Sequence, residues 1–446
     1  MSIRQEIKKV LEQLGLLTEF DKALSWVLQV RLGSSIGFPP YKLGDPPSVT
    51  TTATALVLLK NVTTTTEMEA KMNEDIKWLL REQGNGKIIN PKDKFAWCIA
   101  NHQPSVWATA WAVWALCENG QADSGEVKKG IEYLLATQSK DTGGWPCYFG
   151  LEPRPLYTFV SLKAIATFVQ KTKENNILPR INRSISEAAR FLTNADTTKY
   201  SNMTEVLLMY AGLTLINSLV KQGKLNRYHG PNLRIAISKT KSQCNDFLRR
   251  NLKAYSTPTP IFEPLPVAAG WSVWPFHPAA ISILWRLKKD AAEPIFIRTL
   301  EWFQHNWINI NKKFGGWPDL QSKNPYVYTT LLSLIALHEL ANEMSKVKGW
   351  RYNAILALIQ EVEELKKRLK MTQRKHRIFW ILVPLFTFVG FLIGHYSSLV
   401  YNLLFRVLEF VQLHQIEIGG LIFIISLILE GKDIYNHIRK LIRKIR

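Results

Sequence analysis

A unit of two helices recurs through about the first 343 residues, and this repeat constrains the fold more than any other feature of the chain. Each unit joins a polar helix, with one aromatic residue near its middle, to a small and apolar helix that begins after proline or a polar residue. The loop between them is often rich in glycine, tryptophan and proline. Six apolar helices are expected, beginning at Pro46, Gln103, Arg154, Ser201, His277 and Asn324.

The polar helices precede the apolar ones, and their central aromatic residues are Trp26, Trp78, Tyr133, Phe191, Phe247 and Trp302. One helix pair cannot bury its apolar face alone, but pairs stacked side by side and closed in a ring can. We therefore predict an all-α protein whose apolar helices form the inner layer of a ring. An open solenoid is the alternative, but its units are about 34 to 47 residues long, whereas the units here run roughly 45 to 75 residues.

Residues 129–145 carry a family signature, KGIEYLLATQSKDTGGW. This segment resembles the QW repeat of squalene and oxidosqualene cyclases, and weaker echoes occur at Phe314–Leu320, at Ala269–Pro278 and in the Trp78/Gln83 pair. The resemblance covers about residues 15–343 and implies an α6/α6 toroid of the terpenoid cyclase and prenyltransferase type. It also implies that Gln138, Gly143 and Trp145 are structural, since a glutamine amide can cap a helix end while stacking on an indole.

The chemistry of that family is harder to place on this chain. Its cyclases protonate an alkene or epoxide with a DxDD motif, and no DxDD occurs here. The candidate substitutes are the lone carboxylates Glu205, Asp45 and Asp319, for which a capping or solvated role is the more ordinary one. Glu205 is the most interesting of them, because it falls among apolar residues near the start of an inner helix, and a buried carboxyl favours its protonated form.

No metal site and no cofactor are predicted. The related prenyltransferases hold zinc with Asp, Cys and His near their last inner helices. The matching stretch of this chain has no cysteine, and Asp319 lies far from His338 in the sequence, so a tetrahedral ligand set is incomplete. His102 and His277 each stand just before an inner helix, where a polar cap is expected.

Aromatic residues of the inner helices are candidates for the lining of a central cavity: Trp107, Trp111, Tyr157, Trp274, Tyr326 and Tyr328. Such a lining would suit an isoprenoid or lipid chain. The alternative is that these rings fill the centre of the toroid.

The pattern changes after the toroid. Within residues 344–377, apolar residues alternate in steps of three and four, which predicts a short coiled coil or an amphipathic connector helix. Residues 378–446 are expected to form a membrane anchor. Ile378–Phe405 is long enough to span a bilayer, and Ile418–Leu429 either spans it or lies in its interface. Basic residues lie before the first segment and after the second, which predicts a hairpin with both ends inside: an inner (cytoplasmic) membrane protein with the toroid facing the cytoplasm.

Net charge and cysteine content limit the classes of function that the chain could have. The net charge of +21 lies partly in these membrane flanks, and no nucleic-acid-binding module is recognisable. The four cysteines form no CxxC pair, which predicts a reducing compartment without a disulfide framework. We expect a non-catalytic sensor or effector that binds a ligand or partner protein and couples it to the membrane hairpin. A membrane-bound isoprenoid cyclase or prenyltransferase-like enzyme with non-standard acids is the alternative, and a scaffold that docks a partner or a second copy is a third.

Overall fold

The computed structural model describes residues 3–62, 65–86, 91, 93–99, 103–174, 176–197, 203–225, 228–255, 278–287, 292–318 and 324–346. The chain divides into two compact units, Met1–Tyr352 and Asn353–Arg446, and every described residue belongs to the first. The predicted connector helix and both hydrophobic segments therefore lie outside the described residues.

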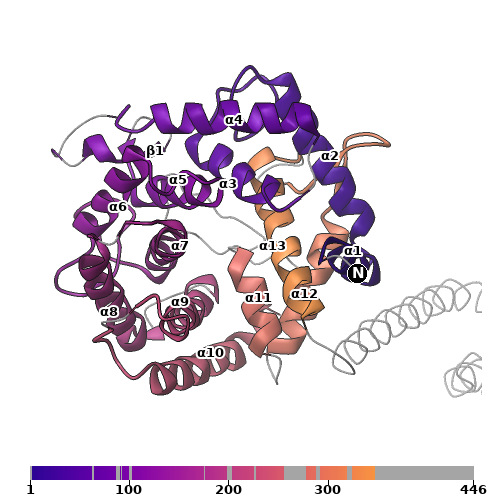
Figure 1. Cartoon of the computed structure of the whole chain (residues 1–446). Coiled ribbons are helices and arrows are strands. Elements are labelled where there is room, and N and C mark those ends of the chain that lie inside the picture. The colour runs from indigo at the N-terminus through magenta and orange to yellow at the C-terminus, as the bar shows by residue number, and fades with distance from the viewer. Residues whose placement is uncertain are drawn as a thin grey trace, which may run out of the picture. The chain divides into compact units, whose positions relative to one another are not determined.

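Helices dominate the described part of the chain and alternate between an outer and an inner layer (Figure 1). The outer helices are α2 (Leu17–Gly33), α4 (Thr66–Arg81), α6 (Gly125–Thr137), α8 (Leu178–Asn194), α10 (Leu233–Tyr255) and α12 (Ala292–His305). The inner helices are α3 (Val49–Leu59), α5 (Val106–Glu118), α7 (Pro155–Lys171), α9 (Met203–Lys221), α11 (Pro278–Leu287) and α13 (Val327–Ser345). One further helix, α1 (Ile3–Gln13), precedes the first pair and packs against α2 and α13.

The inner helices close into a ring. Each packs against the next in chain order, and α13 returns to pack against α3, as Figure 1 shows. This closure confirms the predicted α/α toroid. The burial of the helices explains the two layers. In the inner helix α5, every residue from Val106 to Cys117 is buried. In the outer helix α8, only one face is buried and arginines cover the other.

Local signals fix where several helices begin. Ser105 and Ser124 accept hydrogen bonds from the backbone N–H groups of Trp107 and Val127, and so cap α5 and α6. Pro155 occupies the first position of α7, where its missing N–H has no consequence. Two short antiparallel ribbons lie in the loops: β1 (Cys98–Ile99) pairs with β2 (Gln103–Pro104), and β3 (Ile308–Asn309) pairs with β4 (Gly315–Gly316).

Among the described residues, α9 is the one helix long and apolar enough to cross a membrane, and 67% of its most apolar window is buried inside the structure. Since α9 is a member of the inner ring, its apolar character is accounted for by packing.

Candidate functional site

A set of hydrogen bonds that joins the outer layer to the inner layer, here called a tie, recurs in the loops that lead from outer to inner helices. The indole N–H of Trp145 donates to the carbonyl of Leu134 at 2.6 Å, and its backbone N–H donates to the Thr158 hydroxyl at 3.0 Å. Trp97 and Trp317 make the same two kinds of bond, with Thr109 and Thr330 as the hydroxyl acceptors. In the first repeat, the backbone N–H of Phe38 donates to Thr52. Each of the three tryptophan ties fastens an inner helix to the outer helix before it, and the Phe38 bond fastens the first loop to α3.

Glutamines extend these ties to the next outer helix. Gln138 donates to the carbonyls of Gly143 at 2.7 Å and Ser184 at 2.9 Å, and so joins α6 to α8. Gly143 has φ +83°, and a Cβ there would lie 2.5 Å from the Glu187 carbonyl oxygen, so only glycine fits. Gln83 likewise joins α4 to the Glu126 carbonyl of α6.

Arg31 takes the place of the glutamine in the first repeat. It lies seven residues before Phe38, as Gln138 lies seven before Trp145. Its Nε donates to both carboxylate oxygens of Asp75, at 2.9 and 2.7 Å, and both side chains are fully buried. The sequence analysis missed this pair, because a search for glutamine does not find an arginine in the same role.

Glu205 is fully buried, and its carboxylate lies against the guanidinium of Arg154. Arg154 Nε donates to one carboxylate oxygen at 2.8 Å and Nη2 to the other at 2.5 Å. A guanidinium in bidentate contact stabilises the ionised carboxylate. This geometry ties the start of α7 to the first turn of α9.

The other polar candidates are dispersed. Asp45 accepts a hydrogen bond from the backbone N–H of Lys42 at 3.1 Å, within a loop turn. Asp319, His102 and His277 lie outside the described residues. Burial lowers the pKa of His338. Within the described ranges, no three His, Cys, Asp or Glu side chains group as metal ligands would.

The surroundings of the four cysteines do not favour a reactive thiolate. All four cysteines are free thiols. Burial raises the pKa of Cys117 and of Cys244 to about 12 and that of Cys98 to about 11, and it also raises the pKa of Cys147. The thiolate is the nucleophilic form, so these environments suit packing.

An aromatic cluster lies in the ring between α5, α7 and α13. Trp111 stacks on Trp114 at 4.8 Å, Trp107 meets Trp111 at 5.9 Å and Tyr157 at 6.1 Å edge to face, and the Trp107 indole hydrogen-bonds to the Tyr328 hydroxyl. These side chains are at most 9% exposed. Burial raises the pKa of both Tyr157 and Tyr328, so both keep their protons.

The remaining cavity-lining candidates lie apart from this cluster. Tyr326 packs edge to face on Tyr41 at 5.1 Å, and Trp274 lies outside the described residues.

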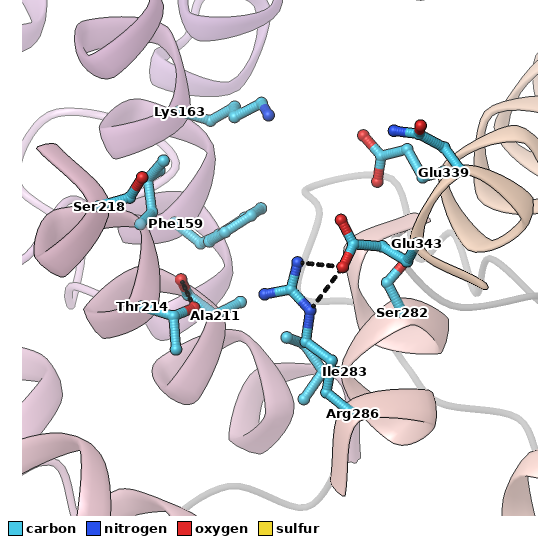
Figure 2. Close-up of a pocket in the computed structure, with 12 residues that line it drawn as sticks. Phe159, Lys163, Ala211, Thr214, Ser218, Ser282, Ile283, Arg286, Glu339 and Glu343 are labelled. Carbon is cyan, nitrogen blue, oxygen red and sulfur yellow. Dashed lines mark hydrogen bonds and ion pairs between the residues drawn. The ribbon is translucent and has the colours of Figure 1, made fainter. Parts of the chain in front are cut away.

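A cavity of about 340 Å³ opens among four consecutive inner helices, and none of the predicted aromatic residues lines it (Figure 2). Its walls are Phe159 and Lys163 of α7, four residues of α9, three of α11 and three of α13. Charged or polar lining residues are Lys163, Thr214, Ser218, Ser282, Arg286, Glu339, Asn342 and Glu343. The volume falls at the lower end of ligand pockets, which are more often apolar.

The cavity's charges divide into paired and unpaired groups. Arg286 and Glu343 form an ion pair, Nη2 to Oε2 at 2.8 Å, and Lys346 approaches the other Glu343 oxygen at 3.1 Å. The side chains of Lys163 and Glu339 make neither a hydrogen bond nor a contact ion pair with any residue that the structure describes. The Lys163 ammonium instead lies 5.0 Å from the centroid of the Trp114 ring, which is cation–π range.

Glu339 and Glu343 have opposite electrostatic environments. Burial raises the pKa of Glu339, and the charge of Lys163 only partly opposes it. Burial also disfavours the charged form of Glu343, but Arg286 and Lys346 outweigh it and lower the pKa of Glu343. The signal that could have revealed this site is a charged residue in an otherwise apolar inner helix, as in YTFVSLKAIATF and ISILWRL.

Comparison with known proteins identifies the fold. No protein-family model and no curated protein matches the chain. Among solved structures, a cellobiose 2-epimerase from Spirochaeta thermophila is similar, with 13% identity and a TM-score of 0.50 over 77% of this chain and 99% of that one.

Two further solved structures overlap less well. An unsaturated glucuronyl hydrolase specific for heparin has 11% identity and a TM-score of 0.48 over 77% and 98% of the two chains. A type II terpene cyclase from Scytonema has 12% identity and a TM-score of 0.44 over 75% and 99%. The likeness to the epimerase supports the α/α toroid as a fold and does not single out the squalene cyclase repeat family.

Proposed function

We propose that the toroid is a non-catalytic ligand-binding module, tethered to a membrane by residues 378–446, whose occupancy is coupled to the membrane segment. The observation that carries the binding part is the open, polar cavity among α7, α9, α11 and α13, with two charged side chains that lack contact ion pairs in the described part of the chain. A partly buried charge without a partner is unfavourable, and a ligand that pairs with it offsets this unfavourable energy.

The arrangement weighs against the cyclase alternative at two points. The candidate acid Glu205 is held by Arg154, and the cavity wall is rich in charged and hydroxyl groups, which suit an isoprenoid chain poorly. The membrane part of the proposal rests on sequence alone, on two hydrophobic segments flanked by basic residues.

The test is to purify the full chain from membranes in mild detergent and analyse both its aqueous and its organic extracts by mass spectrometry. We expect a polar small molecule that the wild type retains and that Lys163→Met loses. An isoprenoid retained equally by both proteins would contradict the proposal and restore the cyclase alternative.

Coupling needs a separate measurement. Limited proteolysis of the membrane-inserted full chain should show that the rate of cleavage between residues 347 and 377 changes when the cavity is loaded. If the cleavage rate does not change although the cavity is shown to hold ligand, the protein binds a ligand but does not couple binding to the membrane segment.

A further inference from the structure

The cavity presents opposite charges on opposite walls. Lys163 extends from α7 and Glu339 from α13, and the space between them is open in Figure 2. The two groups influence one another, since the Lys163 charge acts on the Glu339 carboxyl, but they form no contact ion pair. They therefore face the same cavity within electrostatic range of each other but without direct contact.

Arg286 supplies a second cationic group to the same space. Its Nε and Nη2 both point to Glu343 Oε2, at 3.2 and 2.8 Å. The third nitrogen of the guanidinium points away from Glu343, toward the side of the cavity where Ala211 and Thr214 of α9 lie (Figure 2). Glu343 thus fixes the orientation of Arg286 and leaves one edge of the guanidinium to a ligand, and guanidinium edges match carboxylate and phosphate oxygens.

The other walls set the size and polarity of the occupant. Thr214 and Ser218 of α9 and Asn342 of α13 offer neutral hydrogen-bonding groups, and Phe159 offers an apolar face. A volume of about 340 Å³ equals that of about eleven liquid water molecules at roughly 30 Å³ each. This is the size of a small metabolite.

We propose that this cavity binds a small organic anion that also carries hydrogen-bond donors, with its carboxylate or phosphate between Lys163 and Arg286 and its hydroxyl or ammonium groups on Glu339. The inference rests on the proposed ligand-binding function and deepens it by naming the ligand class. A molecule with only one of the two functions leaves either the cations or Glu339 unmatched, and an unmatched group discriminates strongly against it.

The experiment is thermal-shift titration of the detergent-solubilised full chain with four probes. Gluconate and L-glutamate combine a carboxylate with donors, whereas acetate is an anion alone and sorbitol offers hydroxyls alone. We expect a saturable rise in Tm with gluconate or glutamate and none with acetate or sorbitol at equal concentration. Lys163→Met should raise the apparent Kd about tenfold or more, and Glu339→Gln should raise it several-fold.

Lys346→Met is the matched control, because Lys346 contacts Glu343 but does not line the cavity; its apparent Kd should stay near that of the wild type. An equal response to acetate would reduce the site to a plain anion site, and an equal response to sorbitol would reduce it to a polyol site. If the Tm of Lys163→Met rises with the probes as the wild-type Tm does, the probes bind at another site. Each of these results overturns the ligand class.

The failure of this inference can be told from that of the proposed function. If none of the four probes raises Tm and an uncharged molecule co-purifies with the chain, the ligand class is wrong and ligand binding stands. If none raises Tm and no molecule co-purifies, both fail.

Discussion

Arg154 and Glu205 join two neighbouring inner helices through a bidentate ion pair, with Nε to Oε1 at 2.8 Å and Nη2 to Oε2 at 2.5 Å. Arg154 stands immediately before α7 and is 28% exposed, whereas Glu205 in the first turn of α9 is fully buried. Glu205, which the sequence analysis considered as a candidate acid, therefore links two inner helices in this structure.

Replacing Arg154 by methionine should destabilise the protein by about 2 to 4 kcal/mol, because it removes a guanidinium from a buried carboxylate. The lower part of the usual range applies, since water reaches Arg154. Chemical denaturation of the full chain in detergent measures this. The double variant Arg154→Met/Glu205→Gln should recover much of the loss, and a double variant as unstable as the sum of both single variants would show that the two side chains act independently.

The ties between layers predict a second stability effect. Thr158→Val keeps the shape of the side chain but removes the acceptor for the Trp145 backbone N–H, so it should cost about 1 to 3 kcal/mol. Thr193→Val is the matched control, because that hydroxyl bonds only to the Ala189 carbonyl of its own helix, and the change should stay within about 0.5 kcal/mol. Equal melting temperatures for both variants would contradict a role for the tie.

The helix pairs were predictable because periodicity is a local property. The outer helices alternate polar and apolar residues at helical spacing, and inner helices such as α5 are apolar throughout. The ring follows from these two patterns, because each pair needs a neighbour on both sides. The packing of α13 against α3 could therefore be predicted without any additional sequence motif.

The site was not predictable in the same way, because the identity of a distant partner is not a local property. Nothing near Glu205 in the sequence indicates Arg154, fifty-one residues earlier. Arg31 occupies the position that glutamine holds in two later repeats, Gln83 and Gln138. The aromatic residues were conspicuous, and five of the six proposed as cavity lining pack against one another or against Tyr41. Lys163 and Glu339 were not singled out, because the sequence does not show that the two residues line one cavity.

Membrane attachment stays a prediction from the sequence, and alkaline carbonate extraction tests it. The full chain should remain with the membrane pellet, because Ile378–Phe405 is long enough to span. The double variant Val389→Arg/Leu392→Arg should leave the pellet, since each arginine at mid-span costs about 2.5 to 3.5 kcal/mol on insertion scales. Gln360→Arg/Gln373→Arg adds the same charge outside the segment and should behave as the wild type. Release of the wild type by carbonate would contradict an integral anchor.

The two glutamates of the cavity predict pH effects of opposite sign. Burial raises the pKa of Glu339 above its ordinary value of 4.5, so the folded protein binds this proton more tightly than the unfolded chain does. The free energy of unfolding must then fall as pH rises from about 4.5 through the raised pKa. Lys163, Arg286, Glu343 and Lys346 are the charged groups that act on it. The α9 residues that line the cavity are Ala211, Thr214, Leu215 and Ser218, and none of them is charged.

Glu343 has the reverse linkage. Burial opposes its charge, but Arg286 and Lys346 lower its pKa below 4.5, so its contribution to stability is present above pH 4.5 and is lost as pH falls through the lowered pKa. Glu339→Gln should therefore unfold at a higher temperature than the wild type at pH 7, and Glu343→Gln at a lower one. Both differences should shrink toward pH 4. Thermal unfolding of the three full-length proteins from pH 4 to pH 8 measures this, and shifts of the same sign at pH 7 would contradict the assignment of one unpaired and one paired carboxylate.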